Sequence, residues 1–141
     1  MLRRLYEIAD VLRHHAHARK LNPTAAMGRR GEDLAHRFLQ RAGFTIVARN
    51  YRTASGNGEI DLIGWEGEAL VIAEVKSRRT DEYGTPDRAI GQEKKMALIR
   101  AAREFARHAE VSWERVRFDV VTVVFAAPPL VQHFRDVFRA P

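Results

Sequence analysis

The stretch that decides the fold is GEIDLIGWEGEALVIAEVKSRR, residues 58–79. Two apolar runs, 59–64 and 68–76, are separated by a turn signal at Glu66 and Gly67, so the stretch predicts a hairpin of two adjacent antiparallel strands. Both runs also carry ionisable residues at positions where a buried strand is normally apolar. The stretch therefore raises the question of why charge is placed inside a strand.

Strand geometry gives a first answer, because side chains two residues apart point to the same face of a sheet. Glu74 and Lys76 therefore share a face, and Asp61 comes within cross-strand reach of Glu74 if the register places them opposite each other. Two neighbouring carboxylates repel, and burying even one is costly without a cation or hydrogen-bond donors. Mg²⁺ prefers oxygen ligands, is commonly held by one or two carboxylates and keeps several waters. One such water can act as a nucleophile, which Lys76 would orient or assist.

A simpler interpretation stays open. Glu74 and Lys76 can form a plain ion pair at a strand end, and Asp61 can reach solvent near the turn. The spacing is more restrictive than an isolated E-x-K, however, since twelve residues separate Asp61 from Glu74. The pattern thus favours a metal site without requiring one.

The rest of the chain predicts one αβ domain. Apolar residues at helical spacing predict a helix over 29–42 and a second, longer helix that ends near His108. An Asn-Pro break at residues 22–23 separates a short basic helix, expected over 2–16, from this domain. The further strands are expected over residues 44–51, 117–125 and 130–138. The resulting order, αβββαββ, with two strands that are almost entirely apolar, predicts a mixed central sheet flanked by helices.

Composition narrows the class of protein. The 141 residues are 45% hydrophobic and contain no cysteine, which suits a single globular core and excludes disulfides and thiolate zinc sites. No apolar run approaches the roughly 20 residues that cross a bilayer, and the N-terminus lacks the apolar core of a signal peptide. We therefore expect a cytoplasmic protein with no membrane partner.

The charge is uneven along the chain. The net charge is +6 and the isoelectric point is about 10.3, which favours nucleic-acid binding. Residues 1–30 contribute 7 basic against 2 acidic side chains, whereas residues 31–141 contribute 17 against 16. We accordingly predict a basic N-terminal extension over 1–27 and a domain over 28–138, with local basic clusters after residue 75 and along the second helix.

These motifs together resemble a known family. GRRGEDLAHRFLQRAGF, ARNYR, GEIDLI, EVKSRR, YGTP, RFDVVTV and HFRDVF cover the chain from Gly28 to Phe138. They resemble the YraN-type bacterial proteins, which are similar to Holliday junction resolvases of the PD-(D/E)XK nuclease superfamily. Ile60 stands where the superfamily name has proline, a residue without a chemical role in the mechanism.

The resemblance carries expectations for the fold and for the site. It implies a restriction-endonuclease-like sheet and a DNA substrate, with branched or junction DNA as one form, that is cut by hydrolysis of a phosphodiester. Asp61 and Glu74 would hold Mg²⁺, which Mn²⁺ can replace, and Lys76 would be the catalytic lysine. Glu32 on the first helix would add a carboxylate, although an acid in a first helical turn also suits the helix dipole. Symmetric cutting of two strands would suit a homodimer.

Several basic and polar residues are candidates for contact with nucleic acid. Lys94 falls on the apolar stripe of its helix, so it either extends to solvent or meets an anion, namely a phosphate or the acidic cluster. The other candidates are Gln92, for which a capping role is the simpler interpretation, and Arg78, Arg79 and Lys95. A second function stays open: a binding or scaffold protein on a nuclease fold that holds nucleic acid without cutting it.

Overall fold

The computed structural model describes residues 23–79 and 89–141, with the side chains of residues 23 and 24 left out. The short helix expected over 2–16 and the YGTP motif at residues 83–86 lie outside the described residues. In the described ranges, no helix combines the length and apolar character needed to span a membrane.

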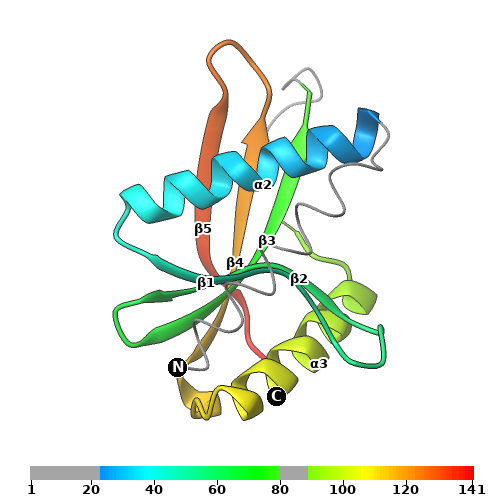
Figure 1. Ribbon diagram of the computed structural model, residues 1–141, viewed down its shortest axis with the longest axis vertical. Coiled ribbons are helices and arrows are strands. Elements are labelled where there is room, and N and C mark those ends of the chain that lie inside the picture. The colour runs from blue at the N-terminus through cyan, green and yellow to red at the C-terminus, as the bar shows by residue number, and fades with distance from the viewer. Residues whose placement is uncertain (1–22, 80–88) are drawn as a thin grey trace.

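A five-stranded sheet forms the centre of the molecule (Figure 1). Its strands are β1 (Thr45–Arg52), β2 (Glu59–Glu66), β3 (Ala69–Arg78), β4 (Val116–Val124) and β5 (Leu130–Phe138), and their spatial order equals their order in sequence. Every neighbouring pair is antiparallel except β3 and β4, which are parallel. A parallel pair needs a crossover connection, and the segment between these strands supplies it.

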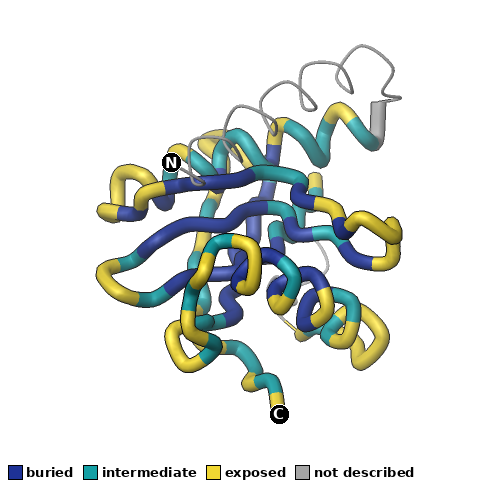
Figure 2. Tube along the Cα trace, turned by 60° about the horizontal axis from the view of Figure 1, so that its bottom comes forward, coloured by how far each residue is buried: buried dark blue, intermediate teal, exposed yellow. Residues whose placement is uncertain are grey.

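Two helices flank the sheet, one on each face. α2 (Pro23–Arg41) crosses one face, and α3 (Gln92–His108) lies against the other (Figure 1). The pleat explains this division, because alternate residues of β3 belong to different cores. Leu70 and Ile72 pack with α3, whereas Val71 and Ala73 pack with α2. The neighbouring strands β3 and β4 are therefore buried on two sides. Exposed residues gather in the turns (Figure 2).

The predicted element order is confirmed, with small changes in the boundaries. α2 begins at Pro23, six residues before the expected start, because proline is well accepted in the first turn of a helix. The break expected at residues 22–23 is thus the beginning of this helix. The β2–β3 turn falls at Gly67 and Glu68, one residue later than expected, with Gly67 at φ 57°. Glycine adopts such a positive φ readily, which suits a two-residue hairpin.

A buried carboxylate ties β4 to β5. The Asp119 side chain has no exposed surface and accepts hydrogen bonds from Arg117 at 2.9 and 2.8 Å and from the Asp136 amide at 3.0 Å. His133 Nε2 lies 2.7 Å from Asp119 Oδ2. Asp119 and His133 therefore have structural roles in joining these two strands. The bond to the Asp136 amide also fixes the irregular end of β5, where Asp136 has a φ of 53°.

The close approach of α2 to β3 yields a stability prediction. A methyl group at Gly31 would lie 1.8 Å from Ser77 Oγ, whereas one at Gly28, on the same helix, would meet nothing within 4 Å. We expect Gly28→Ala to stabilise the protein by roughly 0.5–1 kcal/mol through helix propensity. Gly31→Ala should instead lower the free energy of unfolding by about 1–3 kcal/mol relative to Gly28→Ala, because it overpacks the interface. Urea unfolding measures both values, and adding Ser77→Ala to Gly31→Ala should restore part of the loss.

A second prediction concerns Asp119. Burial alone would raise the pKa of Asp119, but the hydrogen bonds from Arg117 and His133 outweigh it and hold the pKa below 3.8. The carboxylate therefore stabilises the fold fully above about pH 4, and this contribution is lost as the pH falls through the lower native pKa. Asp119→Asn should cost about 3 kcal/mol at pH 7, because it leaves the cation of Arg117 with less compensation. The difference from wild type should shrink when urea unfolding is repeated at pH 3.

The matched control for this variant is Asp136→Asn. Within the described ranges, the Asp136 carboxylate pairs at 2.9 Å only with the exposed Arg139, so its loss should change stability by less than about 0.5 kcal/mol. Equal effects of the two substitutions would show that burial and multiple hydrogen bonds do not distinguish Asp119.

Candidate functional site

The strand register brings Asp61 and Glu74 together. Leu62 pairs with Ala73 and Ile63 with Ile72, so continuing the antiparallel ladder by one residue places Asp61 opposite Glu74. The two side chains hydrogen bond each other just beyond the last paired residues, Leu62 and Ala73, and the Val75 amide donates to Asp61 Oδ2 at 2.8 Å. The cross-strand contact expected from the sequence is therefore present.

This acidic pair carries the electrostatic signature of crowded carboxylates. Burial raises the pKa of Asp61 well above its usual range, and the hydrogen bond with Glu74 and the charge of Glu74 raise it further. The Glu74 residue is only 8% exposed, and its buried Oε2 has no hydrogen-bond partner. Two carboxyl groups in contact require either a shared proton or a cation between them. The pair is therefore incompletely compensated within the described residues.

Glu32 approaches the same region from α2. Burial raises its pKa, against a hydrogen bond from Asn50 and the charge of Arg49, and the charge of Glu32 in turn contributes to the raised pKa of Asp61. Arg49 Nη2 is 3.7 Å from Glu32 Oε2, and this buried oxygen accepts no hydrogen bond from residues 23–79 or 89–141. The structure thus places Glu32 near the acidic pair, with a second unsatisfied carboxylate oxygen.

Two lysines approach the pair from different elements. The Lys94 ammonium, from the first turn of α3, lies 3.2 Å from Glu74 Oε2, as a charge contact without well-aligned hydrogen-bond geometry. Burial alone would lower the pKa of Lys94, but the charges of Glu74 and Asp61 outweigh it and hold the pKa above its usual value. Lys76 donates instead to the carbonyl oxygen of Ala89. The anion that meets Lys94 on its apolar stripe is thus the acidic cluster.

The donor set fits a divalent cation bound mainly by two carboxylates. Asp61 and Glu74 offer hard oxygen ligands, as Mg²⁺ and Mn²⁺ require, and the unsatisfied oxygen of Glu74 is the observation that supports the fit. Among the described side chains, no three from His, Asp and Glu converge closely enough to hold one ion. A direct bond from Glu32 to the metal therefore stays a prediction, as does its catalytic role.

The remaining residues predicted to bind nucleic acid are spread around this site. Gln92 is exposed at the start of α3, where Gly91 is the N-cap, so a capping role for Gln92 is not observed. Arg78 ends β3, and Arg79 follows as an exposed bend. The Lys95 ammonium lies 5.4 Å from the centre of the Phe138 ring, away from the acidic pair. Their contact with nucleic acid stays a prediction.

One residue near the site was not anticipated from the sequence. Thr122 of β4 pairs with Lys76 of β3 and is 1% exposed, and its hydroxyl oxygen has no hydrogen-bond partner in the part of the chain that the structure describes. The signal was present as a single polar residue inside the apolar run VVTVVF. It became meaningful only when the parallel register placed it beside Lys76.

Comparison with known proteins places the chain in a family. The model of the uncharacterised protein family UPF0102 matches residues 31–123. The chain is 45% identical over 138 residues to a UPF0102 protein of Solibacter usitatus, covering 98% of this chain and 100% of the relative. The chain belongs to the UPF0102 family. A UPF0102 protein of Rhodococcus opacus is 45% identical over 115 residues, covering 80% of this chain and 96% of the relative.

The family match contains most of the acidic site. Residues 31–123 include Glu32, Asp61, Glu74, Lys76 and Lys94. A relative from Koribacter versatilis is also a UPF0102 protein, 45% identical over 101 residues that cover 72% of this chain and 70% of the relative. The YraN-type resemblance is therefore confirmed at the level of the family, and the names of these relatives state no activity.

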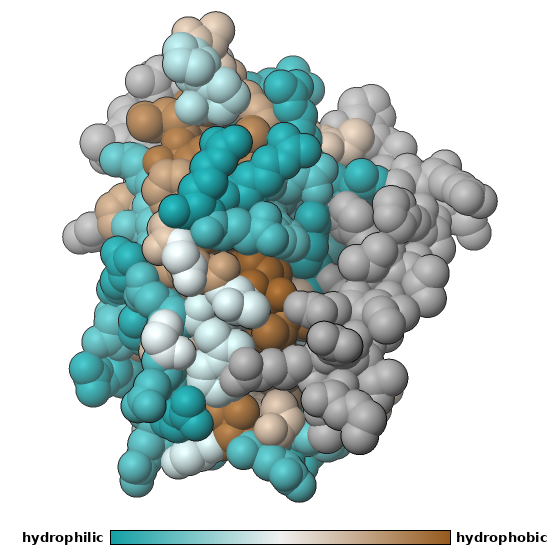
Figure 3. Space-filling view, turned by 60° about the vertical axis from the view of Figure 1, so that its left-hand side comes forward, coloured by the Kyte–Doolittle hydropathy of each residue, from teal (hydrophilic) through white to brown (hydrophobic). Residues whose placement is uncertain are grey.

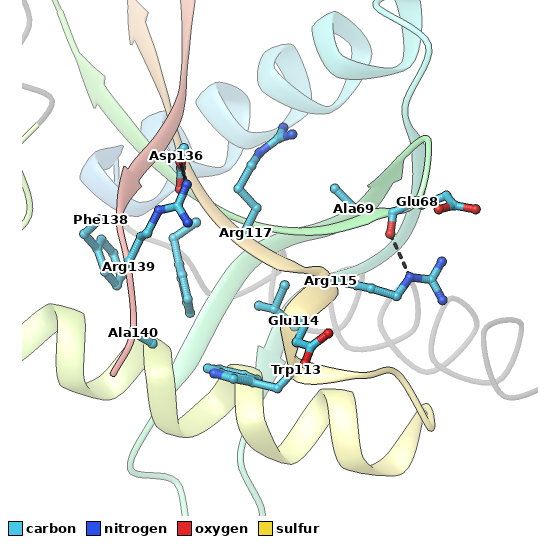
Figure 4. Close-up of a pocket in the computed structure, with 12 residues that line it drawn as sticks. Glu68, Ala69, Trp113, Glu114, Arg115, Arg117, Asp136, Phe138, Arg139 and Ala140 are labelled. Atoms are coloured by element: carbon cyan, nitrogen blue, oxygen red, sulfur yellow. Dashed lines mark hydrogen bonds and ion pairs between the residues drawn. The ribbon is translucent and has the colours of Figure 1, made fainter.

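A hollow of about 500 Å³ lies at the other end of β3 and β4 in this UPF0102 protein (Figure 4). Its arginines already have partners: Arg115 donates to the Glu68 carbonyl at 2.9 Å, and Arg139 to Asp136 at 2.9 Å. Arg117 is turned away toward α2, where it binds Asp119. The hollow contains none of the predicted site residues, and its acidic and basic side chains balance, so it does not favour an anionic ligand.

Few large hydrophobic side chains are exposed among the described residues. Figure 3 shows one face, on which hydrophilic side chains separate the hydrophobic areas. The large hydrophobic residues exposed in the described ranges are Met96 and Leu130, at 43% and 47%, and they lie on different elements. The homodimer expected from the resemblance stays a prediction.

The crowded acidic pair predicts that one substitution stabilises the metal-free protein. A carboxyl group whose native pKa is raised above 3.8 destabilises the fold as the pH rises through the native value, since the charged form is disfavoured there. Asp61→Asn removes this charge and keeps an oxygen acceptor for the Val75 amide. We expect a gain of about 1–2 kcal/mol in urea unfolding at pH 7 with chelator present.

Asp33→Asn is the matched control on the neighbouring helix. Asp33 Oδ1 lies 2.8 Å from Arg49 Nη2, so losing this charge should cost up to about 1 kcal/mol instead of stabilising the protein. A loss of similar size for Asp61→Asn would mean that the acidic pair is well compensated.

Proposed function

We propose that this UPF0102 protein is a metal-dependent endonuclease that hydrolyses phosphodiester bonds in DNA. The observation that carries the proposal is the facing pair of Asp61 and Glu74, with an unsatisfied buried oxygen on Glu74 and two lysines close by. An ordinary structural carboxylate is satisfied by donors from the protein. An acidic pair that the fold leaves incompletely compensated suits the binding of a cation.

Each residue has a role in this proposal. Asp61 and Glu74 would hold Mg²⁺ or Mn²⁺, with Glu32 as a further carboxylate from α2. When bound, the metal would activate a water and stabilise the charge that develops on the phosphate. Lys76 shares the face of Glu74, so its ammonium can move from the Ala89 carbonyl to orient the attacking water or to stabilise that charge. Val75 fixes the orientation of Asp61 through its amide.

DNA is the proposed substrate because the elements that carry the acidic site also carry basic side chains that can bind backbone phosphates. Arg78 and Arg79 follow the β3 carboxylate, and Gln92 and Lys95 lie on the first turns of α3. Guanidinium and ammonium groups bind phosphates without regard to base sequence. We infer that these residues hold flanking phosphates, and that the protein therefore selects DNA by shape, with branched DNA as the preferred form.

The test is the cleavage of labelled linear, flapped and four-way-junction DNA. Wild-type protein should cut with Mg²⁺ or Mn²⁺ and not with chelator. Glu74→Ala should lower the cleavage rate by at least about 10²-fold and leave DNA binding within about threefold, because it removes a metal ligand and no phosphate contact. Glu114→Gln, which changes an exposed glutamate of the 3₁₀ turn Trp113–Arg115, is the control and should cut like wild type.

The alternative function makes a different prediction in the same experiment. If the protein binds DNA but neither wild type nor Glu74→Ala cuts any substrate with either metal, the endonuclease proposal is wrong. A binding or scaffold protein on a nuclease fold is then the function to pursue.

A further inference from the structure

We propose that Lys94 is the cation that compensates Glu74 while no metal is bound, and that a divalent metal displaces it toward the substrate phosphate. This inference rests on the proposed function, because it needs a metal at the Asp61–Glu74 pair. The inference gives α3 a part in the site, because Lys94 in its first turn would exchange Glu74 for a phosphate when the metal binds. Lys94 would thereby link metal binding to phosphate binding.

The position of Lys94 supports the first half of the proposal. Its ammonium lies 3.2 Å from Glu74 Oε2, the same buried oxygen that accepts no hydrogen bond from the described residues and would be the ligand for a metal. An ammonium and a divalent cation cannot both be close to one carboxylate oxygen without strong repulsion. Binding of the metal at Glu74 therefore requires the ammonium to withdraw.

The side chain of Lys94 is able to withdraw. It is 48% exposed, whereas the Glu74 side chain is 10% exposed, so the lysine reaches into the site from solvent. A lysine has a flexible four-carbon stem, and a metal bound at Glu74 replaces the charge of the ammonium, so the buried carboxylate keeps a cation when Lys94 leaves. Glu74 itself is fixed on a central strand and cannot follow.

The second half of the proposal concerns where the ammonium goes. Lys94 extends from the start of α3, where backbone N–H groups point out of the helix and favour an anion. Lys76 is engaged by the Ala89 carbonyl, so the two lysines have separate partners before the metal arrives. A phosphate oxygen that approaches the metal would meet the released Lys94 ammonium beside it. Metal and phosphate would thus replace one ion pair by two favourable contacts.

The experiment is a titration of the full-length protein with Mn²⁺ alone. Binding is measured by calorimetry or by the electron spin resonance of free Mn²⁺. Lys94→Met removes the competing cation and should tighten Mn²⁺ binding by about three- to tenfold, the range expected for losing one partly exposed ion pair. Lys94→Arg keeps a cation at this place and should stay nearer to wild type than Lys94→Met.

A charge control separates displacement from a general electrostatic effect. Arg100→Met removes one positive charge from the same helix, where Arg100 donates to the Asn57 carbonyl at 3.1 Å and contacts no site carboxylate in the described residues. It should change Mn²⁺ affinity by less than about twofold. In wild type, lysine-selective ¹H–¹⁵N spectra should also show the Lys94 Nζ signal, identified by its loss in Lys94→Met, shift when diamagnetic Mg²⁺ is added.

The outcomes distinguish the two proposals. If Lys94→Met binds Mn²⁺ as wild type does or more weakly, Lys94 does not compete with the metal and this inference is wrong, while the metal site stands. If Arg100→Met raises the Mn²⁺ affinity as much as Lys94→Met does, the inference is also wrong, because the net charge of the protein then explains the effect. If neither wild type nor any variant binds Mn²⁺ at millimolar concentration, the metal site of the proposed function is itself wrong. Circular dichroism establishes that each variant is folded.

Discussion

The antiparallel register of β2 and β3 is the constraint on which the candidate site depends. It brings Asp61 and Glu74 into contact just beyond the last paired residues, Leu62 and Ala73. A slip by one residue would turn the Asp61 side chain to the opposite face of the sheet and reverse the burial of the whole strand, so the apolar pattern of β2 fixes the register. The two-residue turn at Gly67 and Glu68 adds a local restraint in the same sense. Core packing and site geometry are therefore set by the same pairing.

Much of the fold could be predicted because the elements are locally encoded. The runs VIA and VVTVV could only be central strands, and the alternation of charge on β2 and β3 indicated which side chains share a face. The start of α2 at Pro23 was missed because an Asn-Pro pair signals a break more often than a helix start. The acidic pair could be inferred from spacing alone, since hairpin geometry converts sequence separation directly into distance.

The rest of the site could not be predicted because it depends on contacts between distant elements. Nothing in the sequence near Lys76 indicates that its ammonium binds the carbonyl of Ala89. The sequence left open whether Lys94 meets solvent, a phosphate or the acidic cluster. The position of α3 over the sheet places its ammonium 3.2 Å from Glu74 Oε2. Thr122 gained interest only through its parallel pairing with Lys76. The residue pattern within one helix or strand shows which side chains share a face. Which side chain of another element each of them contacts can be seen only in the packed structure.

Two buried carboxylate clusters on this sheet show how structure and function are told apart here. Asp119 is surrounded by donors from Arg117, His133 and the Asp136 amide, and its pKa is lowered despite burial. Asp61 has one amide donor and a second carboxyl group as its neighbour, and its pKa is raised. Because a fold gains no stability from crowding acids, the second arrangement is costly in the metal-free protein unless a ligand compensates it. At Asp119, 45 residues after Glu74 in the sequence, the same sheet provides enough hydrogen-bond donors to compensate a buried carboxylate. The shortage of donors around the acidic pair is therefore a property of that place and the strongest physical reason to look for a cation there.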